Sequence, residues 1–351
     1  IGRNFKESLQ KAFRSLEIGV DGLDLKAELK INKNELNTYL TTTCTERTIA
    51  IKIALKSGYS IQKIHEMTYL DPWFIDQILQ IVEIEKLILS EKSLDPELLL
   101  KAKKNGFSDN QIGELLNKKG TEIRELRKSL KINPIYSLVD TCAGEFSAST
   151  PYFYSCYGDY NEIRITNKDS IIVLGSGPNR IGQGIEFDYS CVHTVKALRE
   201  MGYEAIMINS NPETVSTDYD TSDKLYFEPL TFEDVMNVYE AEKPIGMIVQ
   251  MGGQTPLNLA NKLMEAGVPI LGTSPTSIAA AEDRELFRQL LNKLNLKQPL
   301  SSTAKTYKEA SEIVDKIGFP VMIRPSFVLG GRAMMVAYDN KELKPFVEAA
   351  F

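Results

Sequence analysis

The sequence predicts a multidomain protein in which an all-helical N-terminal region is followed by an α/β region with a parallel sheet. Two observations lead to this prediction. Amphipathic helical patterns fill the chain to about residue 150, and from residue 171 short apolar runs alternate with helical segments. Strands that alternate with helices form βαβ units, whose right-handed crossovers make the strands parallel. We therefore expect a doubly wound sheet with helices on both faces.

The composition is that of a soluble globular chain with room for two or three domains. The chain has 351 residues, of which 43% are hydrophobic and 25% charged, and a formal net charge of −6. It has no basic stripe and no apolar run of about 20 residues, so we expect neither nucleic acid nor a membrane as a partner. The four cysteines form no Cys-x-x-Cys pair, which favours reduced thiols in a cytoplasmic protein and gives no metal site.

The N-terminal part carries several helix-start signals but no chemistry. Asp71 followed by Pro72 predicts the start of a long helix through Leu89, and Ser108 with Gln111 predicts a capping box. We interpret Trp73, the only tryptophan, as a core anchor. The region is predicted to be a packing and assembly unit.

The helical pattern stops between residues 136 and 167. An aromatic patch in this stretch contains Tyr152, Phe153, Tyr154, Tyr157 and Tyr160. Aromatic rings bury a large area at small entropic cost. We therefore expect residues 151–168 to form a connector that packs against its neighbours.

The most informative stretch is a glycine-rich turn between the first predicted strand and helix. The apolar run 171–174 predicts a strand buried on both faces, and glycines follow at 175, 177, 182 and 184 before Asp188, which we expect to cap a helix over 188–202. Backbone amides at such a turn suit an anion. A second interpretation is that the glycines serve only a tight turn and close helix packing.

A dinucleotide fingerprint is not satisfied by this turn. Arg180 stands where the third glycine of Gly-x-Gly-x-x-Gly is required, and Pro178 removes one amide. The next predicted strand, 205–209, ends at Asn209 instead of the acid that binds ribose. Classical NAD binding is therefore the weakest interpretation.

Further strands are predicted at 224–227, 246–250 and 269–271, with helices at 231–241 and 255–266. Gly252 and Gly253 follow the fourth strand, so they lie at the carboxyl edge of the sheet, where open α/β sheets bind ligands. Glu186 and Glu213 come near the same edge. These acids would either steer a polar substrate or cap the helices that follow them, which is the more frequent role of an acid at this edge.

A hairpin predicted at 320–337 is the second candidate for chemistry. Its first strand carries Arg324, and its loop contains Gly330 and Gly331. Amides and a guanidinium together suit phosphate, although a flexible tip with a solvent-facing arginine explains the same pattern. With Arg284, the two glycine loops favour a nucleotide phosphate.

Five motifs between residues 170 and 335 resemble the large chain of carbamoyl-phosphate synthase. The first reads Gly175-Ser-Gly-Pro-Asn-Arg-Ile-Gly-Gln-Gly-Ile-Glu-Phe-Asp-Tyr189. The others span residues 209–223, 250–256, 281–284 and 324–334. The helical part is similar to the oligomerisation domain of that family through Arg14-Ser-Leu-Glu17 and Val139-Asp-Thr-Cys-Ala143.

The resemblance implies a domain order and an activity. Residues 1–150 would be the oligomerisation domain, 169–282 a pre-ATP-grasp domain, and 283–351 the truncated first part of an ATP-grasp domain. The family's intact enzyme makes carbamoyl phosphate from bicarbonate, glutamine-derived ammonia and two ATP, for arginine and pyrimidine biosynthesis. This chain resembles the start of its second half, which phosphorylates carbamate. A glutaminase subunit or domain and homo-oligomerisation through residues 1–150 are implied.

The resemblance also implies roles for individual residues. The ATP phosphates would be contacted by Arg284, Arg324, Gly330 and Gly331. The passage through which carbamate arrives would contain Arg180, Glu186 and Glu213. No catalytic residue is assigned, because the attacking oxygen belongs to carbamate.

The metal ligands are expected outside this chain. The resemblance places the carboxylates that hold Mg²⁺ or Mn²⁺ beyond Phe351, and the chain, which starts at Ile1 and stops inside an apparent helix, looks cut at both ends. Because metal ions supply much of phosphoryl-transfer catalysis, the isolated chain is predicted to be inactive. The alternatives are another ATP-grasp ligase, which the preceding helical region argues against, and an assembly module with a passive α/β platform.

Overall fold

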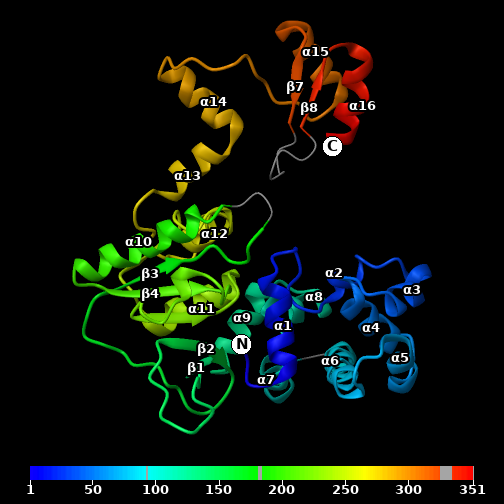
Figure 1. Ribbon diagram of the computed structural model, residues 1–351, viewed down its shortest axis with the longest axis vertical. Helices are drawn as coiled ribbons and strands as arrows, with labels where there is room; N and C mark the ends of the chain where they lie inside the picture. The colour runs from blue at the N-terminus through cyan, green and yellow to red at the C-terminus, as the bar shows by residue number, and fades with distance from the viewer. Residues whose placement is uncertain (92–93, 181–183, 325–333, 351) are drawn as a thin grey trace. The chain divides into compact units, whose positions relative to one another are not determined.

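The computed structural model describes residues 1–91, 94–180, 184–324 and 334–350 (Figure 1). The chain forms two compact units. The first contains residues 1–178 and 187–269, and the second contains residues 179–186 and 270–351.

The first unit begins with a helical region, residues 1–131. Its α-helices are α1 (Phe5–Ser15), α2 (Leu25–Glu28), α3 (Leu36–Thr41), α4 (Arg47–Lys56), α5 (Ile61–Thr68), α6 (Pro72–Ser90), α7 (Pro96–Lys104), α8 (Asp109–Leu115) and α9 (Gly120–Ser129). The start of α6 is confirmed, since the Trp73 amide donates to Asp71 at 2.8 Å. Ser108 caps α8 by accepting from the Gln111 amide at 3.0 Å, but the predicted capping box is not complete, because the Gln111 side chain donates to the Leu23 carbonyl and does not bond back to Ser108. Each capping side chain satisfies an amide that has no partner within its helix.

Helix α6 joins two hydrophobic cores of the helical region. Ile75, Ile78 and Val82 pack in the first core, with α1 to α5, whereas Ile81 and Ile88 pack in the second, with α7 to α9. The prediction that Trp73 anchors a core is wrong. Its side chain is 51% exposed and packs edge-on against Phe5, with ring centroids 5.4 Å apart.

A six-stranded sheet follows the helical region. Its strands are β1 (Ile135–Leu138), β2 (Tyr152–Cys156), β3 (Ser170–Leu174), β4 (Glu204–Asn209), β5 (Lys224–Phe227) and β6 (Gly246–Ile248). Their order is β1-β2-β5-β4-β3-β6, and all neighbours are parallel except β1 and β2. Strands β3 and β4 are buried along their whole length, as a parallel sheet covered on both faces requires.

Two details of the sheet differ from the sequence prediction. The stretch expected to lack regular structure contains β1 and β2, and Phe153 of β2 stacks on Tyr226 of β5 at 5.3 Å. The aromatic patch therefore extends the sheet and is not merely a cover for it. In contrast, the strand predicted at 269–271 is not formed; that stretch is joined to β6 by a hydrogen bond from the Met247 amide to the Pro269 carbonyl, 2.9 Å.

Three long helices flank the sheet: α10 (Glu186–Glu200), α11 (Phe232–Glu242) and α12 (Gln254–Glu265). The β3–β4 and β5–β6 crossovers run in opposite directions across the sheet. Right-handed crossovers therefore put α10 and α11 on opposite faces. Helix α10 begins two residues before Asp188, which does not cap it; the Asp188 carboxylate accepts from the Ser216 amide at 3.1 Å.

The second unit contains α13 (Pro275–Glu282), α14 (Arg284–Lys293), α15 (Tyr307–Ile317), β7 (Val321–Ile323), β8 (Met335–Ala337) and α16 (Asn340–Ala350). Strands β7 and β8 are antiparallel, with Val321 opposite Ala337. Val314, Leu343 and Val347 pack with Ala337 in a small core. The hairpin predicted from the sequence is therefore present in its two strands.

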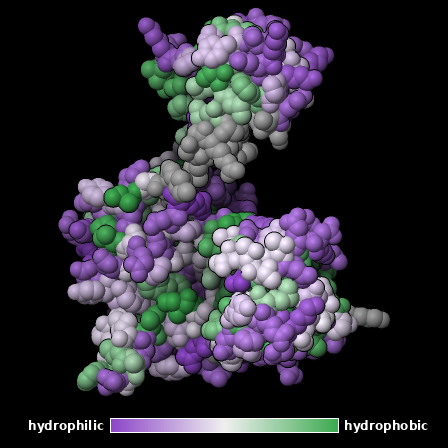
Figure 2. All heavy atoms as spheres, turned by 45° about the vertical axis from the view of Figure 1, so that its right-hand side comes forward, coloured by the Kyte–Doolittle hydropathy of each residue, from purple (hydrophilic) through white to green (hydrophobic). Residues whose placement is uncertain are grey.

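The hydropathy of the surface and the state of the cysteines are those expected from the composition. In the view of Figure 2 most of the surface is hydrophilic, with separate hydrophobic patches. All four cysteines are free, and burial raises the pKa of the Cys191 thiol to about 12. Within the described residues no helix is both long enough and apolar enough to span a membrane.

Candidate functional site

The glycine-rich loop, residues 175–178, follows β3 at the carboxyl edge of the sheet. Its amides are used within the protein: Gly175 donates to the Ile208 carbonyl at 2.8 Å, and Gly177 donates to the Asn209 side chain at 3.1 Å. Asn209 is fully buried and also donates to the Ser216 hydroxyl at 3.3 Å. These contacts favour the tight-turn interpretation of this loop, and they give Asn209 a role that the sequence reasoning missed.

Two positions at this edge require glycine, Gly252 because other backbone atoms lie close to it and Gly177 because of its backbone conformation. A side chain at Gly252 would overlap the carbonyl oxygens of Leu174 and Gly175, so the loops after β6 and β3 lie in direct contact. Gly177 has φ +71°, a left-handed conformation that side chains rarely adopt. The sequence reasoning placed both loops at one edge of the sheet, and in the first unit the structure brings them together.

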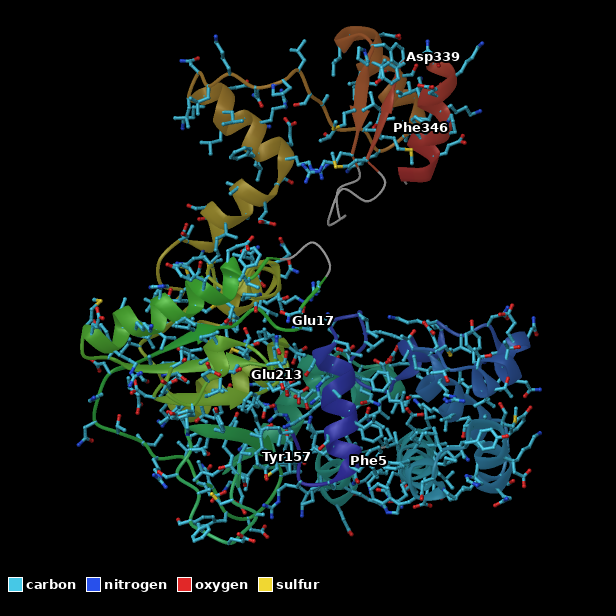
Figure 3. All side chains as sticks on the ribbon, in the orientation of Figure 1. Phe5, Glu17, Tyr157, Glu213, Asp339 and Phe346 are labelled. Carbon is cyan, nitrogen blue, oxygen red and sulfur yellow. The ribbon has the colours of Figure 1, made fainter. Side chains whose placement is uncertain are left out.

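Glu17, at the end of α1, reaches this edge from the helical region. Its carboxylate accepts a hydrogen bond from the Thr255 hydroxyl at 2.5 Å, and it lies against the α-carbon of Gly177. Figure 3 shows α1 running from Phe5 to Glu17, which follows its last turn. In the sequence analysis Glu17 appeared only in the Arg14–Glu17 motif, which supported the family resemblance, and no role was predicted for it.

Arg284 and Arg324 lie together in the second unit. Arg284 is the first residue of α14, and its guanidinium donates to the Arg324 carbonyl at 2.9 Å. Partial burial and the charge of Arg324 lower the pKa of Arg284. The N-terminus of a helix also disfavours a cation. The two residues, which we call the arginine pair, therefore concentrate positive charge that an anion would stabilise.

The remaining predicted residues are distributed over both units. Glu213 is exposed in the loop after β4 of the first unit, where its amide donates to Asn211 at 2.9 Å. Arg180 is half-buried and Glu186 exposed in the second unit. Glu186 occupies the first turn of α10, where an acid interacts favourably with the helix dipole. Gly330 and Gly331 lie outside the described residues.

A buried charge network joins the helical region to α11. The Asp109 carboxylate lies 3.0 Å from the Lys103 ammonium and 2.8 Å from the Arg127 guanidinium. Lys103 also pairs with Glu233 of α11 at 2.6 Å, and Arg127 donates to Asn237 at 2.8 Å. Burial alone would raise the pKa of Glu233, but Lys103 and Arg127 lower it to about 2.

Two more buried ion pairs connect α1 with the α/β part of the first unit. Lys11 lies 3.1 Å from Glu228, and Arg14 lies 3.3 Å from Asp234. The Arg14 guanidinium also donates to the Gly106 carbonyl at 2.7 Å. These ion pairs therefore hold the helical region against the α/β part of the first unit, and their charges are compensated only when both regions are folded.

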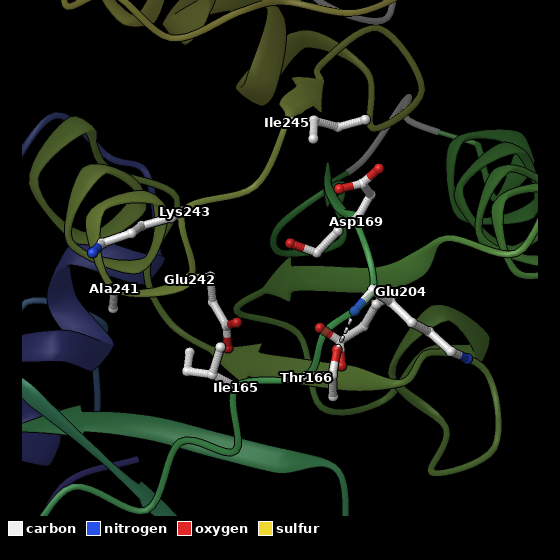
Figure 4. Close-up of a pocket in the computed structure, with 10 residues that line it drawn as sticks. Ile165, Thr166, Asp169, Glu204, Ala241, Glu242, Lys243 and Ile245 are labelled. Carbon is white, nitrogen blue, oxygen red and sulfur yellow. Dashed lines mark hydrogen bonds between the residues drawn. The ribbon is translucent and has the colours of Figure 1, made fainter.

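A pocket of about 280 Å³ lies at the opposite edge of the sheet (Figure 4). Ser170 and Glu204, the first residues of β3 and β4, line it, and Figure 4 shows the carboxylates of Glu204 and Glu242 facing each other. Lys224 neutralises them at 3.2 and 2.8 Å. None of the predicted site residues lines this pocket, and ligands of open sheets bind at the carboxyl edge.

Comparison with known proteins assigns the family. Three family models match the chain: "Carbamoyl-phosphate synthetase large chain, oligomerisation domain" over residues 1–131, "Carbamoyl phosphate synthase preATP-grasp domain" over 167–280, and "Carbamoyl-phosphate synthase L chain, ATP binding domain" over 283–351. The chain belongs to the carbamoyl-phosphate synthase large-chain family. The resemblance read from the five motifs is confirmed.

Individual relatives agree with this family. The carbamoyl phosphate synthase large chain of Archaeoglobus fulgidus is 51% identical over 357 residues, which cover 100% of this chain and 33% of the relative. That of Methanothermobacter thermautotrophicus is 50% identical over 350 residues, covering 100% and 32%. The chain thus spans about a third of the length of these relatives.

Among solved structures, the chain is similar to the biotin carboxylase domain of Hydrogenobacter thermophilus 2-oxoglutarate carboxylase. The match has a TM-score of 0.41 and 18% identity, and it covers 53% of this chain and 41% of the other.

Proposed function

We propose that this chain is part of an ATP-dependent ligase whose second half phosphorylates carbamate to carbamoyl phosphate. The observation that carries the proposal is the arginine pair: the guanidinium of Arg284, at the start of α14, donates to the backbone carbonyl of Arg324, 40 positions later in the sequence. Two sequence features support the second half over the first: the helical region precedes the glycine-rich loop, and that loop ends in Pro178, which is followed by Asn179 and Arg180.

The proposed role of the arginine pair is electrostatic. In phosphoryl transfer, a carbamate oxygen attacks the γ-phosphorus of ATP, the bond between that phosphorus and the bridging oxygen breaks, and ADP leaves. Negative charge is spread over the phosphate oxygens throughout, so fixed guanidinium groups stabilise and orient the group that moves. The carbamate oxygen is already anionic, and no general base is needed.

The proposed cofactors are ATP with Mg²⁺ or Mn²⁺. The described residues contain no group of three or more His, Cys, Asp and Glu side chains that could hold a metal ion. On the basis of the family resemblance, we propose that the metal ligands lie beyond Phe351. The glutaminase partner, the use of bicarbonate and two ATP, and the supply of arginine and pyrimidine synthesis belong to the proposed whole enzyme. The isolated chain is expected to be inactive.

The arginine pair can be tested in the full-length large chain that contains this segment. The reverse reaction, in which ADP and carbamoyl phosphate give ATP and carbamate, isolates the proposed half. Replacing Arg284 by alanine removes charge-assisted contacts worth about 1.5–3 kcal/mol, so kcat/KM for ADP should fall about 10- to 150-fold. Arg284→Lys keeps the positive charge but lacks the planar guanidinium, so it should lower kcat/KM for ADP by a smaller factor.

Arg288 offers a matched control on the same helix. It pairs with Glu285 at 2.6 Å and is not part of the arginine pair. Arg288→Ala should therefore leave kcat/KM for ADP within about twofold of wild type, since an exposed ion pair contributes little. A wild-type value for Arg284→Ala would refute the assignment.

A second proposed property is self-association through the helical region. Trp73 and Phe74 expose 51% and 42% of their surfaces and pack with Phe5 into a ring cluster at the start of α6, which we call the α6 patch. Tyr69, 86% exposed, lies shortly before this helix in the sequence. The match of this region to an oligomerisation-domain model supports a second copy as the occupant.

If a second copy of the chain covers the α6 patch, the protein should form a dimer whose dissociation can be measured. Buried tryptophans at interfaces commonly contribute 2 kcal/mol or more, so Trp73→Ala should weaken association about 30-fold in sedimentation velocity. Tyr338, 69% exposed in the second unit, provides the control, and Tyr338→Ala should leave association unchanged. Equal sedimentation of wild type and Trp73→Ala would exclude the patch as the contact.

A further inference from the structure

We propose that Glu17 is a positioning residue through which the helical region holds the glycine-rich loop and the first turn of α12 in place. The single carboxylate contacts Thr255, the second residue of α12, and Gly177. These segments follow β6 and β3, which are neighbours in the sheet. One side chain from the helical region thus spans two adjacent loops at the edge where the site is proposed.

The surroundings of Glu17 suit a negative charge. Gly253, the N-cap of α12, has no side chain with which to cap the helix, so the carboxylate supplies the negative charge that a helix N-terminus favours. The amides of Gly175 and Gly177 already donate to Ile208 and Asn209. The contact of Glu17 with the glycine-rich loop is therefore one of close packing at Gly177, where a side chain would overlap the carboxylate.

The backbone of Glu17 indicates that its direction is specified. Its φ is +54°, directly after the end of α1, where glycine is the usual residue. A non-glycine residue in this conformation costs roughly 1–2 kcal/mol, and such strain persists where the surrounding structure holds it. The buried pairs of Lys11 and Arg14, one to two turns earlier in α1, provide that hold.

Amide hydrogen exchange of the full-length chain tests the positioning directly. Glu17→Ala and Glu17→Gly should each raise exchange of the amides at 175–178 and 252–257 by about tenfold or more, as expected for the loss of a charge-assisted hydrogen bond. Glycine relieves the left-handed backbone, so faster exchange in Glu17→Gly would come from the missing carboxylate and not from a disturbed helix end. Glu17→Gln keeps an acceptor for Thr255 and should restore most of the protection.

Glu97 provides the matched control. It is exposed in the first turn of α7, and Glu97→Ala should leave exchange at both loops unchanged. Wild-type exchange at 175–178 in Glu17→Gly would overturn the proposal. So would an increase spread equally over β3 and β4, because it would show general destabilisation and not release of the loops.

A kinetic readout rests on the proposed function. Since Glu17 acts through the loops, Glu17→Ala should lower kcat for ATP synthesis from carbamoyl phosphate about tenfold with little change in KM for ADP, and Glu17→Gln should recover it. An unchanged kcat would overturn the link between the loops and catalysis. If the wild-type chain makes no ATP from carbamoyl phosphate, the proposed function fails, while hydrogen exchange still decides the role of Glu17.

Discussion

Replacing Asp109 by asparagine is expected to lower the free energy of unfolding by about 3–5 kcal/mol, because it leaves buried cations uncompensated. Asp109 is 3% exposed and contacts both Lys103 and Arg127, which are 2% and 0% exposed. Glu233 would remain as the only acid paired with Lys103 in this part of the described structure. Urea unfolding followed by circular dichroism measures the loss.

The network also predicts how substitutions combine. Asp109 and Glu233 both compensate Lys103, so the effects of Asp109→Asn and Glu233→Gln should not be additive. Asp159, which is exposed, gives a matched control, and Asp159→Asn should change stability by less than about 0.5 kcal/mol. A loss below about 1 kcal/mol for Asp109→Asn would show that water or rearrangement compensates the cations.

Replacing Gly252 by alanine is expected to reduce both stability and activity. The new methyl group would meet the carbonyl oxygens of Leu174 and Gly175, which belong to a buried strand and its loop and cannot move away independently. Overpacking of this kind costs up to about 3 kcal/mol. Displacement of the loops by about 1 Å should slow ATP synthesis from carbamoyl phosphate about 100-fold in the full-length chain.

Gly267 separates the clash from general effects of removing a glycine. It has φ +86° and nothing within 4 Å of an added Cβ, so Gly267→Ala introduces backbone strain of roughly 1–2 kcal/mol without a collision. Thermal unfolding and the same assay compare the two variants. Equal effects at both positions would mean that contact between the loops is unimportant.

Features governed by local sequence were predictable. The start of α6 at Asp71 and Pro72, and the buried strand β3, follow from capping chemistry and an apolar run, and the structure contains both. Strand β2 was missed because its residues, Tyr152 to Cys156, do not alternate between polar and apolar, and because their burial depends on pairing with β5. Trp73 was misjudged because helical spacing does not reveal which face is covered.

The candidate site was predictable in its parts and not in its contacts. Glycines and arginines could be identified because their chemistry is local and their motifs are long. The contact of Arg284 with Arg324 and that of Glu17 with Thr255 join residues 40 and 238 positions apart. Contacts between residues so far apart in the sequence leave no periodic pattern, because they form only when the elements pack together in the folded protein. The convergence of the glycine loops with the arginine pair on one triphosphate stays a prediction.

The charges buried between the helical region and α11 have a consequence for evolution. Lys103 and Glu233 stand 130 positions apart, and each compensates part of the other's buried charge. A genetic crossover between them would inherit one partner without the other, and the chimera would bury a charge that is less completely compensated. Homologous enzymes can therefore exchange the helical region only where the residues on both sides of its interface with α11 carry opposite charges. The helical region and α11 are expected to change together in evolution.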